Sequence, residues 1–219
     1  MKKYLAIFTL FTCLGFGAQA QLRFGIEGSP TFNWTPTSTD DIESNLQLKF
    51  NYGLLLEYAF AENYLISSGV YHSFDGGQIE FSDATDTTSG VYTLNLKPEY
   101  VEVPILLKMR TKEIGYMTYF ARIGLSAGFR ISDDFAFADD AIDEEDVFPD
   151  ASEPMSALFK TAMKIGLGAE YNLGGSTSII LGATLTNNFN DMVNRKPALD
   201  NDNETIKYKN LAINVAVIF

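Results

Sequence analysis

Hydrophobic and polar residues alternate with a period of two along most of the chain. In LQLKFNYGLLLEYAF, Leu46 to Phe60, every even position is large and apolar, whereas most odd positions are polar or small. This period places successive side chains on opposite faces of a β-strand. Eight such segments are present, and the fourth could break near Pro98: Leu22–Trp34, Leu46–Phe60, Tyr64–Phe74, Val91–Arg110, Tyr116–Ile131, Ala157–Asn172, Thr177–Phe189 and Thr205–Phe219. The pattern predicts an all-β fold.

The connections between these segments alternate in length. Three are tight turns, at Ala61–Asn63, Thr111–Gly115 and Leu173–Ser176. Four are long, at Thr35–Asn45, Asp75–Gly90, Ser132–Ser156 and Asn190–Glu204. An antiparallel meander with this alternation has short turns at one end and long loops at the other. Outer-membrane barrels have short periplasmic turns and long extracellular loops.

The N-terminus has the pattern of a secretory signal peptide. Lys2 and Lys3 precede an apolar run, and Ala18-Gln19-Ala20 is a small-residue cleavage pattern. We expect residues 1–20 to be removed after Ala20, leaving one barrel domain at residues 21–219. Cleavage removes Cys13, the only cysteine, so the exported domain has no internal disulfide and no catalytic thiol.

Charge follows the division into strands and loops. The expected mature chain has 14 Lys and Arg against 28 Asp and Glu, and 21 of these acids lie in the four long connections. Such an acidic chain is unsuited to binding nucleic acid. One end of the molecule is therefore predicted to be strongly anionic.

The second face of the strands distinguishes a membrane barrel from a soluble one. In MTYFARIGLSAGFRI, Met117 to Ile131, the polar set mixes glycine and serine with single long charged residues. A narrow eight-stranded interior needs small residues beside a few long ones that fill it. We expect an interior charge network at these positions, with an ion or proton relay as the alternative: Lys49, Glu57, Glu102, Lys108, Arg122, Arg130, Lys164 and Glu170.

The apolar face has the dimensions of a lipid-facing band. Phe50 and Phe60 are ten residues apart, which corresponds to about 25 Å in a tilted strand. Tyr64 and Phe74 have the same spacing, although Ser68 and His72 between them suit lipid poorly and put that register in question. The last segment ends on Phe219, a terminal aromatic typical of the assembly signal read by the barrel-insertion machinery. The sequence predicts a monomeric, eight-stranded, antiparallel, up-and-down transmembrane β-barrel in the cell outer membrane.

The stretch YVEVPILLKMR, Tyr100 to Arg110, resembles the PorT-type outer-membrane β-barrel family of Gram-negative bacteria. SFDGG, YFARIGLSAGF, GLGAEYNL and the terminal Phe219 extend the resemblance over nearly the whole mature chain. The resemblance implies one outer-membrane barrel, and the founding member is associated with type IX secretion. The family provides no agreed catalytic residues. Pro104 lacks a backbone donor, so we expect a local kink there.

Two groups of residues could carry chemistry. His72 is the only histidine, with Ser73 and Asp75 nearby, but alternation places His72 and Ser73 on opposite faces, which argues against a triad. The loop Ser132–Ser156 could bind Ca²⁺, although it lacks the spacing of a dedicated calcium loop, and a solvated anionic loop is the favoured interpretation. The weak calcium candidates are Asp139, Asp140, Asp143, Glu144, Glu145 and Asp146.

These patterns lead to a functional expectation. We expect a non-enzymatic barrel without cofactors, whose acidic loops contact surface or secretion-system proteins. A small porin-like channel for ions or solutes is the alternative, although an eight-stranded interior is normally filled by side chains.

Overall fold

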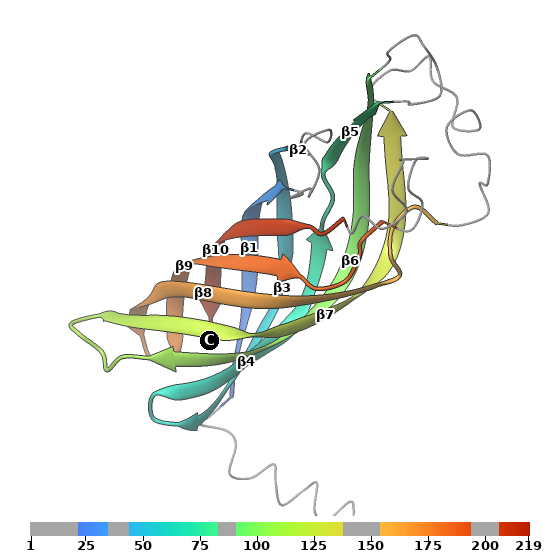
Figure 1. The fold of residues 1–219 in the computed structure, drawn as a ribbon. Helices are drawn as coiled ribbons and strands as arrows, with labels where there is room; N and C mark the ends of the chain where they lie inside the picture. Colours follow the sequence, from blue (N-terminus) through green and yellow to red (C-terminus); the bar gives the residue numbers. More distant parts are fainter. Residues whose placement is uncertain (1–21, 35–43, 83–90, 138–153, 194–205) are drawn as a thin grey trace, which may run out of the picture.

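Eight long antiparallel strands form a closed barrel. The computed structural model describes residues 22–34, 44–82, 91–137, 154–193 and 206–219. The long strands are β1 (Leu22–Trp34), β3 (Gln47–Ala61), β4 (Tyr64–Phe74), β6 (Val91–Arg110), β7 (Met117–Phe137), β8 (Phe159–Gly174), β9 (Thr177–Asn188) and β10 (Lys209–Ile218). Two additional short strands are β2 (Ser44–Asn45) and β5 (Gln78–Ser82). The β6–β7 pairing closes the ring (Figure 1). The predicted eight-stranded fold is confirmed. No helix of the described residues is long and apolar enough to cross a membrane.

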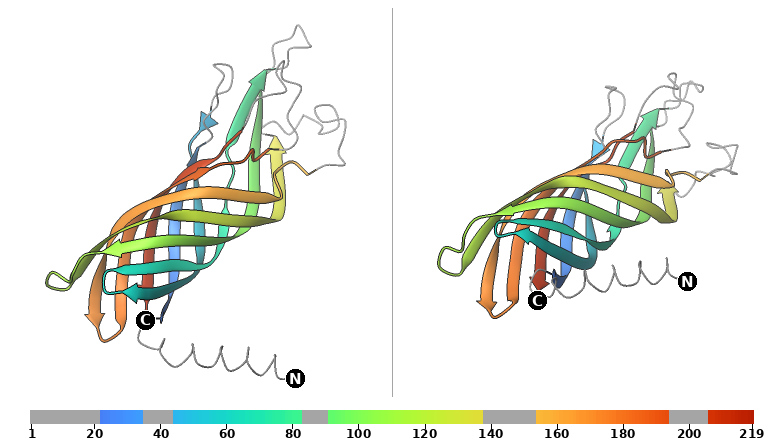
Figure 2. Two further views of the ribbon diagram at one scale, coloured as in Figure 1. Left: turned by 60° about the horizontal axis from the view of Figure 1, so that its bottom comes forward. Right: turned by 90° about the horizontal axis from the view of Figure 1, so that it is seen from below.

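The register defines the size of the barrel. Pairs followed from Phe24 around the ring return to β1 at Trp34, ten residues further along. This stagger in eight strands corresponds to a tilt of about 40° and an interior that side chains can fill. Figure 2 shows the C-terminus at the end that carries the short turns.

The outward face is apolar and the inward face is polar. Leu54 and Leu167 point outward and are 64% and 68% exposed, whereas Lys108 and Glu57 point inward and are each 1% exposed. Such an apolar exterior is suited to contact with lipid. Closure of the barrel also pairs the backbone N–H and C=O groups of neighbouring strands, as a membrane-spanning structure requires. Outward aromatic residues gather at both ends, at Tyr58, Phe60, Tyr64 and Tyr171 near the short turns and at Phe50, Phe129, Phe159 and Phe189 near the loops.

The two prolines of β6 have different effects. The predicted break at Pro98 is wrong, because β6 is continuous and Pro98 pairs with Asp133. At Pro104 the β4–β6 ladder is interrupted between the pairs Ser68↔Ile105 and Tyr71↔Glu102. Proline cannot donate to the ladder, and Ser68 Oγ instead donates to the Pro104 carbonyl at 2.7 Å. The Ser68 hydroxyl therefore has a hydrogen-bond partner on the outward face of the barrel. The predicted inward and outward alternation of Tyr64–Phe74, which Ser68 had put in question, is observed.

Strands β5, β6 and β7 extend furthest at the loop end (Figure 1). β7 continues to Phe137, beyond the predicted end at Ile131, and β5 lies inside the predicted connection Asp75–Gly90. The β6–β7 register shifts at Glu99/Tyr100, and above this point Leu96 pairs with Phe135. The inward face of the two strands therefore changes there from polar to apolar.

Candidate functional site

Near the short turns, four charged side chains fill the lumen. Lys108 Nζ lies 2.5 Å from Glu57 Oε1 and also pairs with Glu170. Arg23 pairs with both of these carboxylates. Lys108 also lies over the Phe120 ring, 4.3 Å from its centroid. Two cations and two carboxylates neutralise one another, as burial of charge requires.

A second charged cluster lies nearer the loop end. Lys160 Nζ lies 2.5 Å from both Asp75 Oδ2 and Glu102 Oε2. Lys160 also donates to Ser73 Oγ at 3.1 Å, and Lys164 pairs with Glu102. This cluster is also formally neutral, and the Lys160, Asp75 and Glu102 side chains are 1–2% exposed.

Arg122 links polar residues in the middle of the lumen. Its Nη1 lies 3.6 Å from Glu27 Oε2, and its Nη2 donates to Thr184 Oγ1 at 2.7 Å. Asn214 donates to the other oxygen of Glu27 at 2.8 Å. A Cβ on Gly166 would lie 2.7 Å from Thr184 Oγ1 and 3.1 Å from Arg122 Cγ. Glycine here makes room for the long arginine, and the cavity left in this part of the lumen is only about 40 Å³.

Many of the charged residues in these lumen clusters were predicted from the sequence. Seven predicted residues form ion pairs, namely Glu57, Glu102, Lys108, Arg122, Arg130, Lys164 and Glu170. Lys49 is half-buried and forms no ion pair with a described residue. Sequence reasoning missed Arg23, Glu27, Asp75 and Lys160. Lys160 could have been found, because it shares the inward alternation of Lys164 and Glu170 in β8.

A separate apolar core lies at the loop end. Its buried members, against which Phe135 and Phe137 pack, are Leu94, Leu96, Tyr100, Met155, Met192, Val193, Ile206 and Tyr208. The Tyr100 hydroxyl donates to the Ala157 carbonyl at 2.8 Å, and Met192 N donates to the Ile206 carbonyl at 2.9 Å. Burial raises the pKa of the Tyr208 phenol well above its usual value, so this side chain stays neutral.

The loop-end core spans the mouth of the barrel. Leu94 and Leu96 belong to β6, whereas Ile206 and Tyr208 directly precede β10. Three strands separate β6 from β10 in either direction around the ring, so these strands face each other across the lumen. Arg130 donates to the Ser156 carbonyl and pairs with Asp133, and Asp133 accepts from Ser156 N at 3.2 Å. These contacts tie the segment before β8 to the same core.

His72 and Ser73 point to opposite sides of the barrel wall, as alternation predicted. Ser73 is buried in the lumen beside Lys160. On the outward face, His72 Nδ1 lies 2.9 Å from the Tyr52 hydroxyl, and Nε2 lies 2.7 Å from Glu99 Oε2. The histidine, serine and Asp75 therefore do not converge into a triad.

The remaining predicted residues have different outcomes. The calcium candidates Asp139, Asp140, Asp143, Glu144, Glu145 and Asp146 lie outside the described residues, as do residues 1–20. Among the described residues, no three or more His, Cys, Asp and Glu form a group that could hold a metal ion. Phe219 N donates to the Phe24 carbonyl at 2.7 Å, and its ring is exposed, so the terminal aromatic lies on the outward face where β10 meets β1.

Comparisons with known proteins agree with this architecture. Residues 17–194 match the family model described as "Outer membrane protein beta-barrel domain". Among solved structures, OprG from Pseudomonas aeruginosa is similar with a TM-score of 0.55 and 12% identity, over 91% of this chain and 96% of OprG. Neisserial surface protein A has a TM-score of 0.46 and 11% identity, over 90% and 97% of the two chains. No curated protein sequence matches significantly.

Proposed function

Because this chain belongs to the outer membrane protein β-barrel domain family, we propose that it is a non-enzymatic outer-membrane barrel that contacts other proteins through its loop end. The observation that carries the proposal is the loop-end core. It packs residues of β6 against segments that lead into β10, on the opposite side of the ring. A folded platform over the mouth suits a binding surface and opposes free diffusion through the lumen.

The lumen supports the same function. Its long side chains are held in neutral ion-paired clusters, and its central cavity has a volume of about 40 Å³. A water molecule needs about 10–15 Å³ of such space, so the cavity accommodates only a few waters. A porin-like channel is the second candidate, favoured by the polar lining, and it would require the charged clusters and the core to move.

The partners that we propose are surface or secretion-system proteins. Acidic residues are concentrated in the long connections, so a partner with a basic surface is electrostatically matched. The resemblance to the PorT-type family makes a component of a type IX-like secretion system one such partner. The separation of His72 from Ser73 supports the non-enzymatic part of the proposal.

Photo-crosslinking in cells tests the proposal. A photoreactive residue at Ala136, exposed at the loop end of β7, should give discrete adducts with a surface or secretion protein. The matched control is Ile114, which is 65% exposed in the β6–β7 turn at the other end. Adducts from Ile114 alone would overturn the assignment of the binding surface to the loop end.

A further inference from the structure

The upper part of β7 is paired on one side only. Nearer the short turns β7 pairs with both β6 and β8, and its last pair with β8 is Phe129↔Phe159. From Ser132 to Ala136, β7 pairs with β6, and no strand of the described residues pairs with its other side. The barrel therefore has an open strand edge at its loop end, where β7 rises beside β6 (Figure 1).

The edge is open because the segment before β8 crosses the mouth of the barrel. Arg130 N donates to the Leu158 carbonyl at 2.9 Å, which continues the β7–β8 contact by one step. Two residues before Leu158, however, Ser156 bridges to Val193. The chain thus leaves β7 and joins the loop-end core instead of extending the ladder.

The backbone groups of Asp133 and Phe135 point toward the open edge. On the other side of β6, Leu96 N donates to the Gly77 carbonyl at 3.0 Å, so Leu96 directs its backbone groups away from β7. Its register partner in β7 is Phe135, which must then direct its own N–H and C=O away from β6. Asp133 shares this direction, because the direction alternates from residue to residue along a strand. Unpaired groups of this kind are a template on which an extended peptide adds as a further strand.

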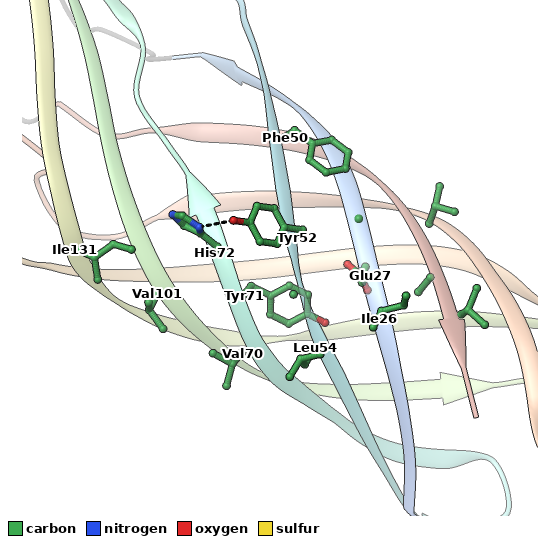
Figure 3. A pocket seen from close by; sticks show the side chains of 15 residues that line it. Ile26, Glu27, Phe50, Tyr52, Leu54, Val70, Tyr71, His72, Val101 and Ile131 are labelled. Carbon is green, nitrogen blue, oxygen red and sulfur yellow. Dashed lines mark hydrogen bonds between the residues drawn. The ribbon is translucent and has the colours of Figure 1, made fainter.

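The open edge lies beyond the lipid-facing surface. Ile131, Val101 and Val70 belong to the apolar lining of a groove on the outward face (Figure 3). The outward side chains that follow Ile131 in β7 are those of Ser132 and Asp134, which are polar. The strand therefore leaves lipid just above Ile131, and the edge is accessible from water.

The inward side of the same segment is anchored. Phe135 and Phe137 pack against the loop-end core, and their ring centroids are 6.4 Å apart. This packing holds the segment extended before any partner binds. A preformed edge lowers the ordering cost of strand addition.

We propose that the open edge of β7, Asp133–Ala136, binds an extended basic segment of a partner protein as an added β-strand. The inference rests on the proposed function, because it specifies how the loop end contacts its partner. The segment is basic because Asp134 is exposed on the outward side of the edge, where a lysine or arginine of the added strand can pair with it. A second copy of this chain is a poor occupant, because pairing of two such edges would bring like charges together.

Peptide binding to the purified barrel in detergent tests this inference. The probe is a fluorescent seven-residue peptide of alternating lysine and valine, compared by anisotropy with a glutamate–valine peptide. We expect the glutamate peptide to bind about tenfold more weakly, because it places like charges opposite each other. The lysine peptide should also slow amide hydrogen exchange at residues 133–136. Unchanged exchange at these residues would overturn the proposal.

A modified peptide separates strand addition from attraction of charge alone. The same lysine peptide with N-methyl groups on its internal amides keeps its charge but cannot donate backbone hydrogen bonds to the edge. We expect this peptide not to bind. Binding equal to that of the unmodified peptide would overturn strand addition.

A charge reversal and a matched control assign the site. Asp134→Lys should invert the preference, so that the glutamate peptide binds more tightly than the lysine peptide. Glu113→Lys makes the same change of charge at an exposed position of the β6–β7 turn, at the opposite end of the barrel, and should keep the wild-type preference. An equal shift in the two variants would show that binding follows overall charge and would contradict the site.

The photo-crosslinking experiment distinguishes this inference from the proposed function. Discrete adducts from Ala136 in cells, together with unchanged amide exchange at residues 133–136 in the presence of the peptide, would overturn strand addition and leave the loop end as the binding surface. Adducts from Ile114 alone would overturn both.

Discussion

Replacing Lys108 with methionine should destabilise the barrel strongly, because it leaves the lumen with an unbalanced charge. Lys108 is 1% exposed and neutralises Glu57 and Glu170 together with Arg23. Without Lys108, one arginine faces two buried carboxylates. Methionine has a similar length and is apolar, so Lys108→Met removes the charge with little change in packing.

The magnitude follows from the local environment. At an effective dielectric constant of about 20, a pair of unit charges 4 Å apart interacts by about 4 kcal/mol. Removing one partner of a buried ion pair costs about 3–5 kcal/mol, mostly because the other charge stays unpaired. We therefore expect Lys108→Met to lower the free energy of unfolding by about 3–5 kcal/mol.

Urea unfolding of the barrel in lipid vesicles measures this loss, and the fluorescence of Trp34, the only tryptophan, reports it. Lys97→Met is the control, because Lys97 is exposed, and it should change stability by less than about 1 kcal/mol. The double variant Lys108→Met/Glu170→Gln restores neutrality with Arg23 and Glu57, so it should be more stable than the summed single effects. A loss below about 1 kcal/mol for Lys108→Met, or strict additivity in the double variant, would refute the reasoning.

Three further predictions concern packing, the loop-end core and assembly. Gly168→Val should lower the amount of folded, heat-modifiable barrel seen on SDS gels, because a Cβ at this position would lie 2.4 Å from the Leu181 carbonyl oxygen. Gly128→Ala should be tolerated, because the nearest atoms to a Cβ there are Lys160 side-chain atoms at 3.3 Å and beyond. Tyr100→Phe loses the hydrogen bond to the Ala157 carbonyl and should destabilise the loop-end core by about 1 kcal/mol, seen as faster protease cleavage at residues 154–158 with an intact barrel; unchanged cleavage would contradict it. Phe219→Ala should slow membrane insertion in a pulse-chase assay, and a wild-type rate would reject Phe219 as the assembly signal.

The strands could be predicted from sequence because each has one lipid-facing side and one filled lumen side. Leu22–Trp34, Tyr64–Phe74 and Val91–Arg110 have the predicted bounds in the structure. The extension of β7 was missed because the register shifts at Glu99/Tyr100. Beyond that point Asp133 and Asp134 are consecutive in the sequence, which is typical of the start of an acidic loop.

The loop-end core could not be predicted, because the periodicity of a strand does not show which residues meet across the lumen. Met155, Met192 and Val193 lie in predicted connections, whereas Leu94 and Tyr208 lie in predicted strands, and only the closed barrel brings them together. The same limit applies to the outward cluster. Alternation places Tyr52 and His72 on the outward face of their strands, but their proximity depends on the register between β3 and β4.

Ion conductance of the purified barrel in planar bilayers tests the central claim most directly. Neutral ion-paired clusters fill the lumen, and the loop-end core spans its mouth. We expect no stable conductance steps from the wild-type barrel. Stable steps from the wild-type barrel would contradict a closed lumen and would favour the channel.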